Sequence, residues 1–197
     1  MWNRIVACLL SALIAGFAPC ALAQADKGKA AATAPRVKFV TSMGDITVEL
    51  DAAKAPITVE NFLAYVKSGH YNGTVFHRVM STFMIQGGGM GPDLKEKATR
   101  APIKLESQNG LKNVRGALAM ARTGVPDSAT SQFFINVVDN PRLDYPNPDG
   151  NGYAVFGRVI EGMEVVDKIK DVAVGNQGHH QNVPATPIVI RSATVLK

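Results

Sequence analysis

Hydrophobic and polar residues alternate along several short stretches of the chain, which is the pattern of β-strands with one buried face. Between residues 37 and 50, the patterns V-x-F-x-T and I-x-V-x-L lie on either side of the turn residues Met43, Gly44 and Asp45. This stretch therefore predicts a β-hairpin. Further strand-like runs, separated by Gly, Pro, Asn and Asp, cover residues 74–80, 83–86, 117–121, 132–138, 153–160 and 188–196.

Two other stretches have the period of a helix. Over residues 58–67, apolar side chains recur at i, i+3, i+4 and i+7, with Thr58 expected to cap the start and Gly69 to end the helix in a left-handed turn. A second, shorter helix is predicted over residues 163–169, where Met, Val and Ile share one side. Many short strands with only two helices exclude a doubly wound parallel sheet, in which the two would alternate. The pattern predicts a mainly β fold, a closed antiparallel β-barrel capped by the two helices.

The N-terminal residues have the composition of a secretory signal peptide. Arg4 supplies a positive charge, residues 5–18 form an almost unbroken apolar run, and residues 21–23 (ALA) are suited to a cleavage site after position 23. The apolar run is shorter than the roughly 20 residues that a membrane-spanning helix needs, so a cleaved signal is favoured over an anchor. Residues 24–34 are small and polar and are expected to form a flexible linker. One domain is then predicted over residues 35–197.

The composition of the chain excludes several classes of protein. Of its 197 residues, 46% are hydrophobic and 19% are charged, which is typical of a compact domain and excludes a disordered or coiled-coil chain. Both cysteines, Cys8 and Cys20, lie in the predicted signal peptide, so the mature domain is not expected to use thiol chemistry. The formal net charge is +5, but its basic residues form no run with interleaved aromatics, and we predict no nucleic-acid binding. No stable membrane association is expected after cleavage, because no other apolar stretch is long enough to span a bilayer.

The motifs of common catalytic and cofactor sites are missing or incomplete. The glycine-rich residues 86–92 match neither G-x-G-x-x-G nor a Walker loop, and we interpret these glycines as allowing close packing of the backbone. His179 and His180 have no acidic residue or cysteine nearby and are predicted to lie in a solvated loop without a metal. His77 is expected to make an internal hydrogen bond. Since the chain also has no nucleophile elbow and no zinc-protease motif, we predict no metal and no other cofactor.

Aromatic, methionine, arginine and amide side chains gather in three segments that contain no acidic residue. These segments are residues 76–80 (FHRVM), 83–88 (FMIQGG) and 131–135 (SQFFI). Arg78 lies in one of the predicted strands, with Phe, Met and Gln close behind it. An arginine in such a position either forms a salt bridge or binds a ligand, and the spacing of the residues does not decide between these two roles.

These segments resemble those of cyclophilin-type peptidyl-prolyl cis-trans isomerases, and most closely the exported bacterial ones. The matching stretches are residues 71–88 (YNGTVFHRVMSTFMIQGG), 114–123 (VRGALAMART), 131–136 (SQFFIN) and 152–159 (GYAVFGRV). The resemblance covers residues 35–197 and implies a barrel of about eight strands, catalysis of rotation about Xaa-Pro bonds, and a periplasmic location. Proline-containing peptides and unfolded exported proteins are the partners it implies. We expect a monomer, since no amphipathic segment is left over for an interface.

The family pattern can be carried over residue by residue. Arg78 corresponds to the catalytic arginine. The walls of the proline pocket correspond to Phe83, Met84, Phe134 and Leu143. The positions that hold the main chain of the substrate correspond to Gln86, Ala121, Arg122 through its backbone, and Gln132.

Two positions depart from the pattern of many relatives. Tyr153 stands at a substrate-binding position where they have His, and Arg142 stands at the rim of the pocket where they have Trp. The departures imply that cyclosporin-like inhibitors bind only weakly.

The sequence also allows a second function, which is not enzymatic. The same pocket could capture proline-containing segments as a holdase chaperone without significant turnover. Arg78 favours the enzyme, because a fixed cationic donor can stabilise a twisted amide more than a planar one.

Overall fold

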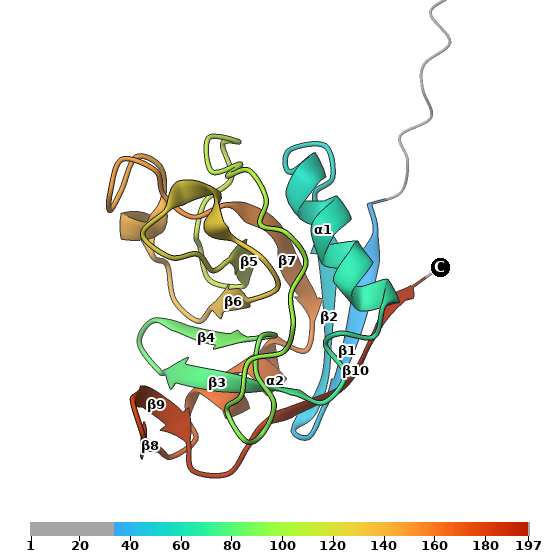
Figure 1. Ribbon diagram of the computed structural model, residues 1–197, viewed down its shortest axis with the longest axis vertical. Coiled ribbons are helices and arrows are strands. Elements are labelled where there is room, and N and C mark those ends of the chain that lie inside the picture. Colours follow the sequence, from blue (N-terminus) through green and yellow to red (C-terminus); the bar gives the residue numbers. More distant parts are fainter. Residues whose placement is uncertain (1–33, 197) are drawn as a thin grey trace, which may run out of the picture. The chain divides into compact units, whose positions relative to one another are not determined.

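The computed structural model describes residues 34–196, and its main feature is a closed antiparallel barrel (Figure 1). Around the barrel the strand order is β1-β10-β3-β4-β6-β5-β7-β2. The eight strands are β1 (Arg36–Thr41), β2 (Gly44–Leu50), β3 (Thr74–Met80), β4 (Met84–Gly87), β5 (Ala117–Met120), β6 (Phe133–Asn136), β7 (Val155–Glu161) and β10 (Val189–Leu196). The predicted fold class is therefore confirmed. The predicted signal peptide, and the linker as far as residue 33, lie outside the described residues.

The first two strands form the predicted hairpin. Thr41 of β1 pairs with Gly44 of β2 at the turn, and Phe39 pairs with Ile46. Both of these apolar side chains are fully buried. Alternation of side chains across the strand therefore places one face of the hairpin in the barrel interior.

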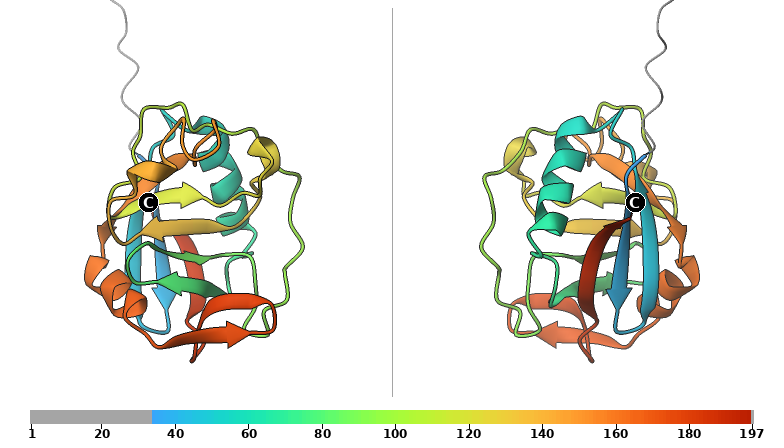
Figure 2. Two further views of the ribbon diagram at one scale, coloured as in Figure 1. Left: turned by 90° about the vertical axis from the view of Figure 1, so that its left-hand side faces the viewer. Right: turned by 90° about the vertical axis from the view of Figure 1, so that its right-hand side faces the viewer.

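Two α-helices lie at opposite ends of β2 (Figure 2). Helix α1 (Pro56–Lys67) begins soon after the end of β2, whereas α2 (Met163–Lys170) packs near its start, with Val165 against Gly44. In the part of the chain that the structure describes, no helix has the length and apolar character needed to cross a bilayer.

The start of α1 differs from the prediction. Thr58 does not cap the helix but lies inside it, because the helix begins two residues earlier at Pro56. The free N–H groups of Ile57 and Thr58 instead donate to the carboxylate of Glu106, at 3.1 and 2.8 Å. At the other end Gly69 has φ of +71°, as predicted for a left-handed helix end.

Aromatic rings fill the interior of the barrel. Phe133 of β6 packs against Phe39, Phe62 and Tyr71, with ring centroids 5.4 to 5.7 Å apart. Phe62, from α1, also contacts Phe156 at 5.0 Å. These contacts join the helix to strands on several sides of the barrel, so the core is continuous.

The loop predicted around His179 and His180 is wrong in part. The region forms a hairpin of β8 (Val174–Gln177) and β9 (His180–Pro184), with His179 in its turn, and it lies beside β3 (Figure 1). All four residues of β8 are exposed. Because neither face of β8 is buried, its sequence carries no hydrophobic alternation that could have revealed it.

Candidate functional site

A row of side chains crosses four neighbouring strands on the outer face of the barrel. Arg78 of β3 pairs with Gln86 of β4, and Gln86 pairs with Phe134 of β6. Phe134 pairs in turn with Ala119 of β5. Directly opposed residues in a sheet point to the same side, so we call these four residues the Arg78 row.

The strands themselves determine that the Arg78 row faces outward. The neighbours Val79, Ile85, Ile135 and Leu118 are fully or almost fully buried in the main core. Since successive side chains of a strand point to opposite faces, the Arg78 row lies on the other side of the sheet.

Apolar side chains form a second, smaller cluster on this outer face. It is separate from the main core, and we call it the outer cluster. Six of the residues predicted at the site belong to it: Met84 and Phe134, which are buried, and Phe83, Ala121, Leu143 and Tyr153, which are partly buried. The tertiary structure thus brings together residues from five separate segments of the sequence.

Hydrogen bonds hold Phe83 at the edge of the outer cluster. Its carbonyl accepts from the backbone N–H of Val137 at 3.1 Å and from Nδ2 of Asn140 at 2.8 Å. Its own N–H donates to the carbonyl of Met80, which closes the turn between β3 and β4. The ring is therefore carried by a fixed backbone.

The guanidinium of Arg78 forms no ion pair among residues 34–196. The residue is half-buried, and its side-chain hydrogen bond goes from Nη2 to Sδ of Met80, at 3.3 Å. A thioether sulfur is a weak acceptor. Of the two alternatives left open by the sequence, the salt bridge is therefore absent from the described residues, and the donors of Arg78 remain available to a ligand.

Two amide side chains lie together beside the Arg78 row. Nε2 of Gln86 donates to Oε1 of Gln132 at 2.9 Å. Gln132 packs directly over Gly89, where a Cβ atom would collide with its side chain. Gly88, with φ of +86°, lies against the ring of Phe133. The predicted role of the glycine-rich segment, close packing of the backbone, is confirmed.

Comparison with known proteins identifies the family. The profile of the family described as "Cyclophilin type peptidyl-prolyl cis-trans isomerase/CLD" matches residues 36–195. The chain belongs to the cyclophilin-type peptidyl-prolyl cis-trans isomerase family.

Individual relatives agree with this assignment. Peptidyl-prolyl cis-trans isomerase A of Dickeya dadantii is 52% identical over 198 residues and is aligned along 100% of both chains. An isomerase of Streptomyces antibioticus is 59% identical, over 81% of this chain and 98% of its own. Among solved structures, a cyclophilin-type isomerase of Cryptosporidium parvum, determined in the presence of the dipeptide Ala-Pro, has a TM-score of 0.71 and 29% identity, covering 82% of this chain and 99% of that one. The chain is thus a peptidyl-prolyl cis-trans isomerase.

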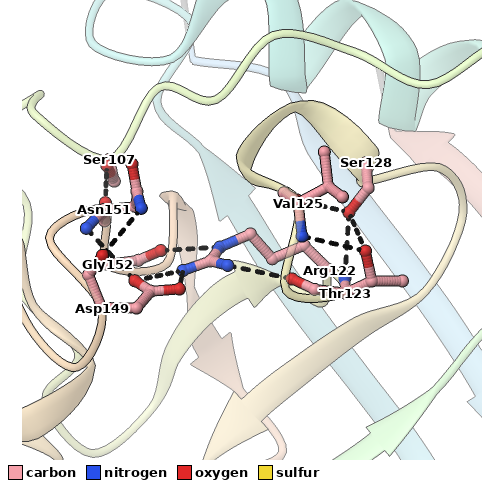
Figure 3. Close-up of polar contacts among 8 residues, drawn as sticks. All are labelled: Ser107, Arg122, Thr123, Val125, Ser128, Asp149, Asn151 and Gly152. Atoms are coloured by element: carbon pink, nitrogen blue, oxygen red, sulfur yellow. Dashed lines mark hydrogen bonds and ion pairs between the residues drawn. The ribbon is translucent and has the colours of Figure 1, made fainter.

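Within this cyclophilin fold, the side chain of Arg122 is buried whereas its backbone is exposed. The residue as a whole is partly exposed, yet its side chain is only 1% exposed. Figure 3 shows the guanidinium between two loops, bonded to Asp149, Gly152 and Thr123. The main chain of Arg122 is therefore the exposed part of the residue, as its predicted backbone role requires.

The two departures from the family pattern lie close together. Tyr153 donates its backbone N–H to the carbonyl of Leu143 at 2.9 Å, and its ring meets Phe134 edge-on at 5.8 Å. Arg142 is exposed in a short 3-10 turn, Pro141–Leu143. Tyr153 thus belongs to the outer cluster, whereas Arg142 does not.

One ring nitrogen of His77, next to Arg78, lacks the hydrogen bond expected of this side chain. The side chain is buried, and its Nδ1 has no partner among the described residues. Burial is the main cause that lowers its pKa to about 4; His180 and Arg78 lower the pKa further, and a backbone hydrogen bond with Val75 opposes the shift. An irregularity in the pairing of β3 with β4 falls between Phe76 and Arg78 and leaves His77 outside the regular register.

Sequence reasoning missed two partners of the site residues, Met80 and Asp149. Met80 lies two positions after Arg78 on the same face of β3, which is a signal that strand periodicity carries. Asp149 is 27 residues from Arg122, in a loop without periodicity, and no local signal points to it.

A cavity of about 480 Å³ lies apart from the predicted site residues. It is lined by Lys54, Leu105, Glu106, Ser107, Gln108, Asn109, Pro126, Asp127 and Asn151. Several of its polar groups already have protein partners: Glu106 binds the start of α1, and Asp127 accepts from the N–H of Leu105. In residues 34–196, no group of three or more potential ligands is arranged to hold a metal ion.

Proposed function

We propose that this isomerase acts on Xaa-Pro bonds of unfolded exported proteins and that the reaction takes place over the Arg78 row, beside the outer cluster. One observation carries the assignment of the site. Arg78 is a half-buried cation without a carboxylate partner in the described residues, and it lies next to an apolar cluster outside the main core. Such a guanidinium can donate a hydrogen bond to a proline residue that is bound against the apolar cluster.

The chemistry of the reaction explains why a cationic donor suffices. Rotation about an Xaa-Pro amide has a barrier of about 18 to 20 kcal/mol, because C–N resonance is lost in the twisted state. The proline nitrogen then becomes pyramidal and regains its lone pair. A hydrogen bond from Arg78 to that nitrogen would stabilise the twisted form more than either planar form, which is the condition for catalysis.

The surrounding residues would hold the two halves of the substrate differently. Phe83, Met84 and Phe134 would enclose the pyrrolidine ring, since they form an apolar surface. Gln86 and the exposed backbone of Arg122 would bind the main chain of the peptide. With the ring fixed, only the flanking peptide turns, and less orientational freedom is lost in the transition state.

The effect required of these residues is moderate. A reduction of the barrier by about 7 kcal/mol accelerates rotation roughly 10⁵-fold. One charged hydrogen bond together with orientation in an apolar pocket can supply this. The rotation needs no covalent intermediate.

Substitution of Arg78 tests the proposal. We expect Arg78→Ala to lower kcat/KM for a Xaa-Pro tetrapeptide at least about tenfold in a protease-coupled assay, because the charged donor is lost. The melting temperature should change little, since Arg78 has no ion pair in residues 34–196.

Arg36→Ala is the matched control. Arg36 is exposed on β1 and pairs with Glu49 of β2, and β1 is not adjacent to any strand of the Arg78 row, so its removal should leave turnover unchanged. Turnover of Arg78→Ala close to that of the wild type would disprove the assigned role. A wild-type protein that binds proline peptides without turning them over would be a holdase chaperone instead.

Export is the second part of the proposal, and it rests on the composition of residues 1–23. A periplasmic isomerase would meet its substrates as unfolded chains emerging from translocation. Weak binding of cyclosporin-like inhibitors also follows from the proposed site, because Arg142 is exposed where an aromatic rim residue is usual in relatives.

A further inference from the structure

The side chain of Arg122 connects two segments that contain predicted substrate-binding residues. One segment leaves β5 through Ala121, Arg122 and Thr123. The other is the irregular stretch 144–153, which ends at Tyr153. The guanidinium occupies the space between these two segments (Figure 3).

Four hydrogen bonds engage all three nitrogens of this guanidinium. Nε donates to the carbonyl of Gly152 at 2.9 Å, and Nη1 donates to that of Thr123 at 2.9 Å. Nη2 donates to both carboxylate oxygens of Asp149, each at 2.8 Å. A buried arginine bonded in this way is held in one position, since charge-assisted bonds are the stronger kind.

The guanidinium also supports the aromatic wall of the outer cluster. Its central carbon lies 4.6 Å from the centre of the Tyr153 ring, within the range of a cation–π contact. Tyr153 in turn meets Phe134 edge-on. A continuous line of contacts thus runs from Asp149 through Arg122 and Tyr153 to Phe134.

The stretch 144–153 is anchored mainly at its two ends, where Ser107 also donates to the carbonyl of Asn151 and Tyr153 donates its N–H to the carbonyl of Leu143. It contains no helix or strand, and residues 145–150 are exposed. Asp144 holds its start by accepting from the N–H and the Nδ2 of Asn113, at 2.7 and 3.0 Å. At its end, the carbonyl of Gly152 and the carboxylate of Asp149 both bond to Arg122.

We propose that Arg122 is a positioning residue, whose side chain holds Tyr153 against Phe134 so that this wall of the proline site is formed before the substrate arrives. The inference rests on the proposed function, which assigns Tyr153 and Phe134 to the substrate site. A wall that is already in place costs less ordering when the peptide binds, so its loss should weaken binding more than it slows rotation.

The effect should require arginine itself. Lysine would keep the charge, but its single nitrogen cannot bond Gly152, Thr123 and Asp149 at the three separate positions that the guanidinium nitrogens occupy, and it has no flat face to stack on Tyr153. Arg122→Lys should therefore resemble Arg122→Met more than the wild type.

Kinetic constants of matched variants test this inference. For Arg122→Met we expect KM for a Xaa-Pro tetrapeptide to rise about tenfold, with kcat changed less than about twofold. Asp149→Asn keeps the arginine and removes the opposing charge, so its KM should rise by a smaller factor. Asp149 is 37% exposed, and this second variant is expected to fold even if Arg122→Met does not.

Arg115→Met is the matched control. Arg115 also bonds both oxygens of one carboxylate, that of Asp167, and one carbonyl, that of Val137. It lies outside the outer cluster. Its loss should lower the melting temperature without raising KM, which separates positioning from a general loss of stability.

Hydrogen exchange adds a readout that does not depend on activity. Peptides covering residues 144–153 should exchange faster in Arg122→Met than in the wild type, whereas β1 and β2 should not change. The inference is wrong if KM and exchange of this stretch stay at wild-type values, or if Arg115→Met raises KM equally. A wild-type protein without turnover would instead refute the proposed function and, with it, this inference.

Discussion

At the scale of single residues, two arginines of the site are in opposite states. Arg122 is buried, and its charge is balanced by Asp149. Arg78 is partly exposed and has only a thioether as its side-chain partner in the described residues. A buried charge requires a partner in the protein, whereas a partly exposed charge is solvated and can bind a ligand. Arg122 therefore suits positioning, and Arg78 suits catalysis.

The buried His77 makes stability depend on pH. Its pKa is about 4 in the folded protein and near 6.5 when unfolded, so between these values only the unfolded state takes up the proton. The contribution of His77 to stability is therefore complete above pH 6.5 and is lost as the pH falls to 4, by about 3 kcal/mol in total. Denaturant titrations at several pH values should show this loss in the wild type and its absence in His77→Gln.

Other groups also titrate in this range, so the comparison needs a control. His179→Gln changes a histidine in the exposed turn of the β8–β9 hairpin and should retain the wild-type slope. Equal slopes for His77→Gln and the wild type would show that His77 does not titrate in this way.

At the scale of elements, the start of α1 is capped from a distant part of the chain. Glu106 accepts from the N–H groups of Ile57 and Thr58 and from the hydroxyl of Thr58, at 3.1, 2.8 and 2.6 Å. A carboxylate is favoured there because the first N–H groups of a helix have no partner in the helix and carry a partial positive charge. The loop that carries Glu106 is thus fastened to α1.

Removal of this carboxylate should destabilise the domain. We expect Glu106→Ala to lower the free energy of unfolding by about 1 to 2 kcal/mol, as measured by urea denaturation, because two helix N–H groups lose their acceptor. Glu60→Ala, at an exposed position of the same helix, should have a much smaller effect. A similar loss in both variants would mean that capping by Glu106 contributes little.

At the scale of the whole molecule, the order of the strands around the barrel assembles the site. The strands that carry the Arg78 row follow the chain order β3, β4, β5, β6, but in the sheet β6 lies between β4 and β5. This exchange places Phe134 beside Gln86 rather than at the far side of β5. The outer cluster depends on the same order, since it combines residues of β4, β5, β6 and β7.

Export is the prediction that concerns the whole chain. We expect the protein recovered from the periplasmic fraction of a Gram-negative host to begin at Gln24, as read from its intact mass, because signal peptidase cleaves after small residues such as Ala23. A charge placed in the apolar run, as in Leu10→Arg, should keep the uncleaved chain in the cytoplasm. Full-length protein in the periplasm would contradict cleavage.

Local patterns in the sequence were enough to determine the two helices, most of the barrel strands and, through the resemblance, the family. Such features depend on the side-chain periods of helix and strand, which act over a few neighbouring residues. Only the tertiary structure decided that Glu106 caps α1, that the side chain of Arg122 is buried against Asp149, and that β8 pairs with β9. The first two depend on partners 48 and 27 residues away, and the third on β8, a strand with no buried face, so none of them has a local period. These contacts exist because closing the barrel brings distant loops together, and that closure is a property of the whole chain.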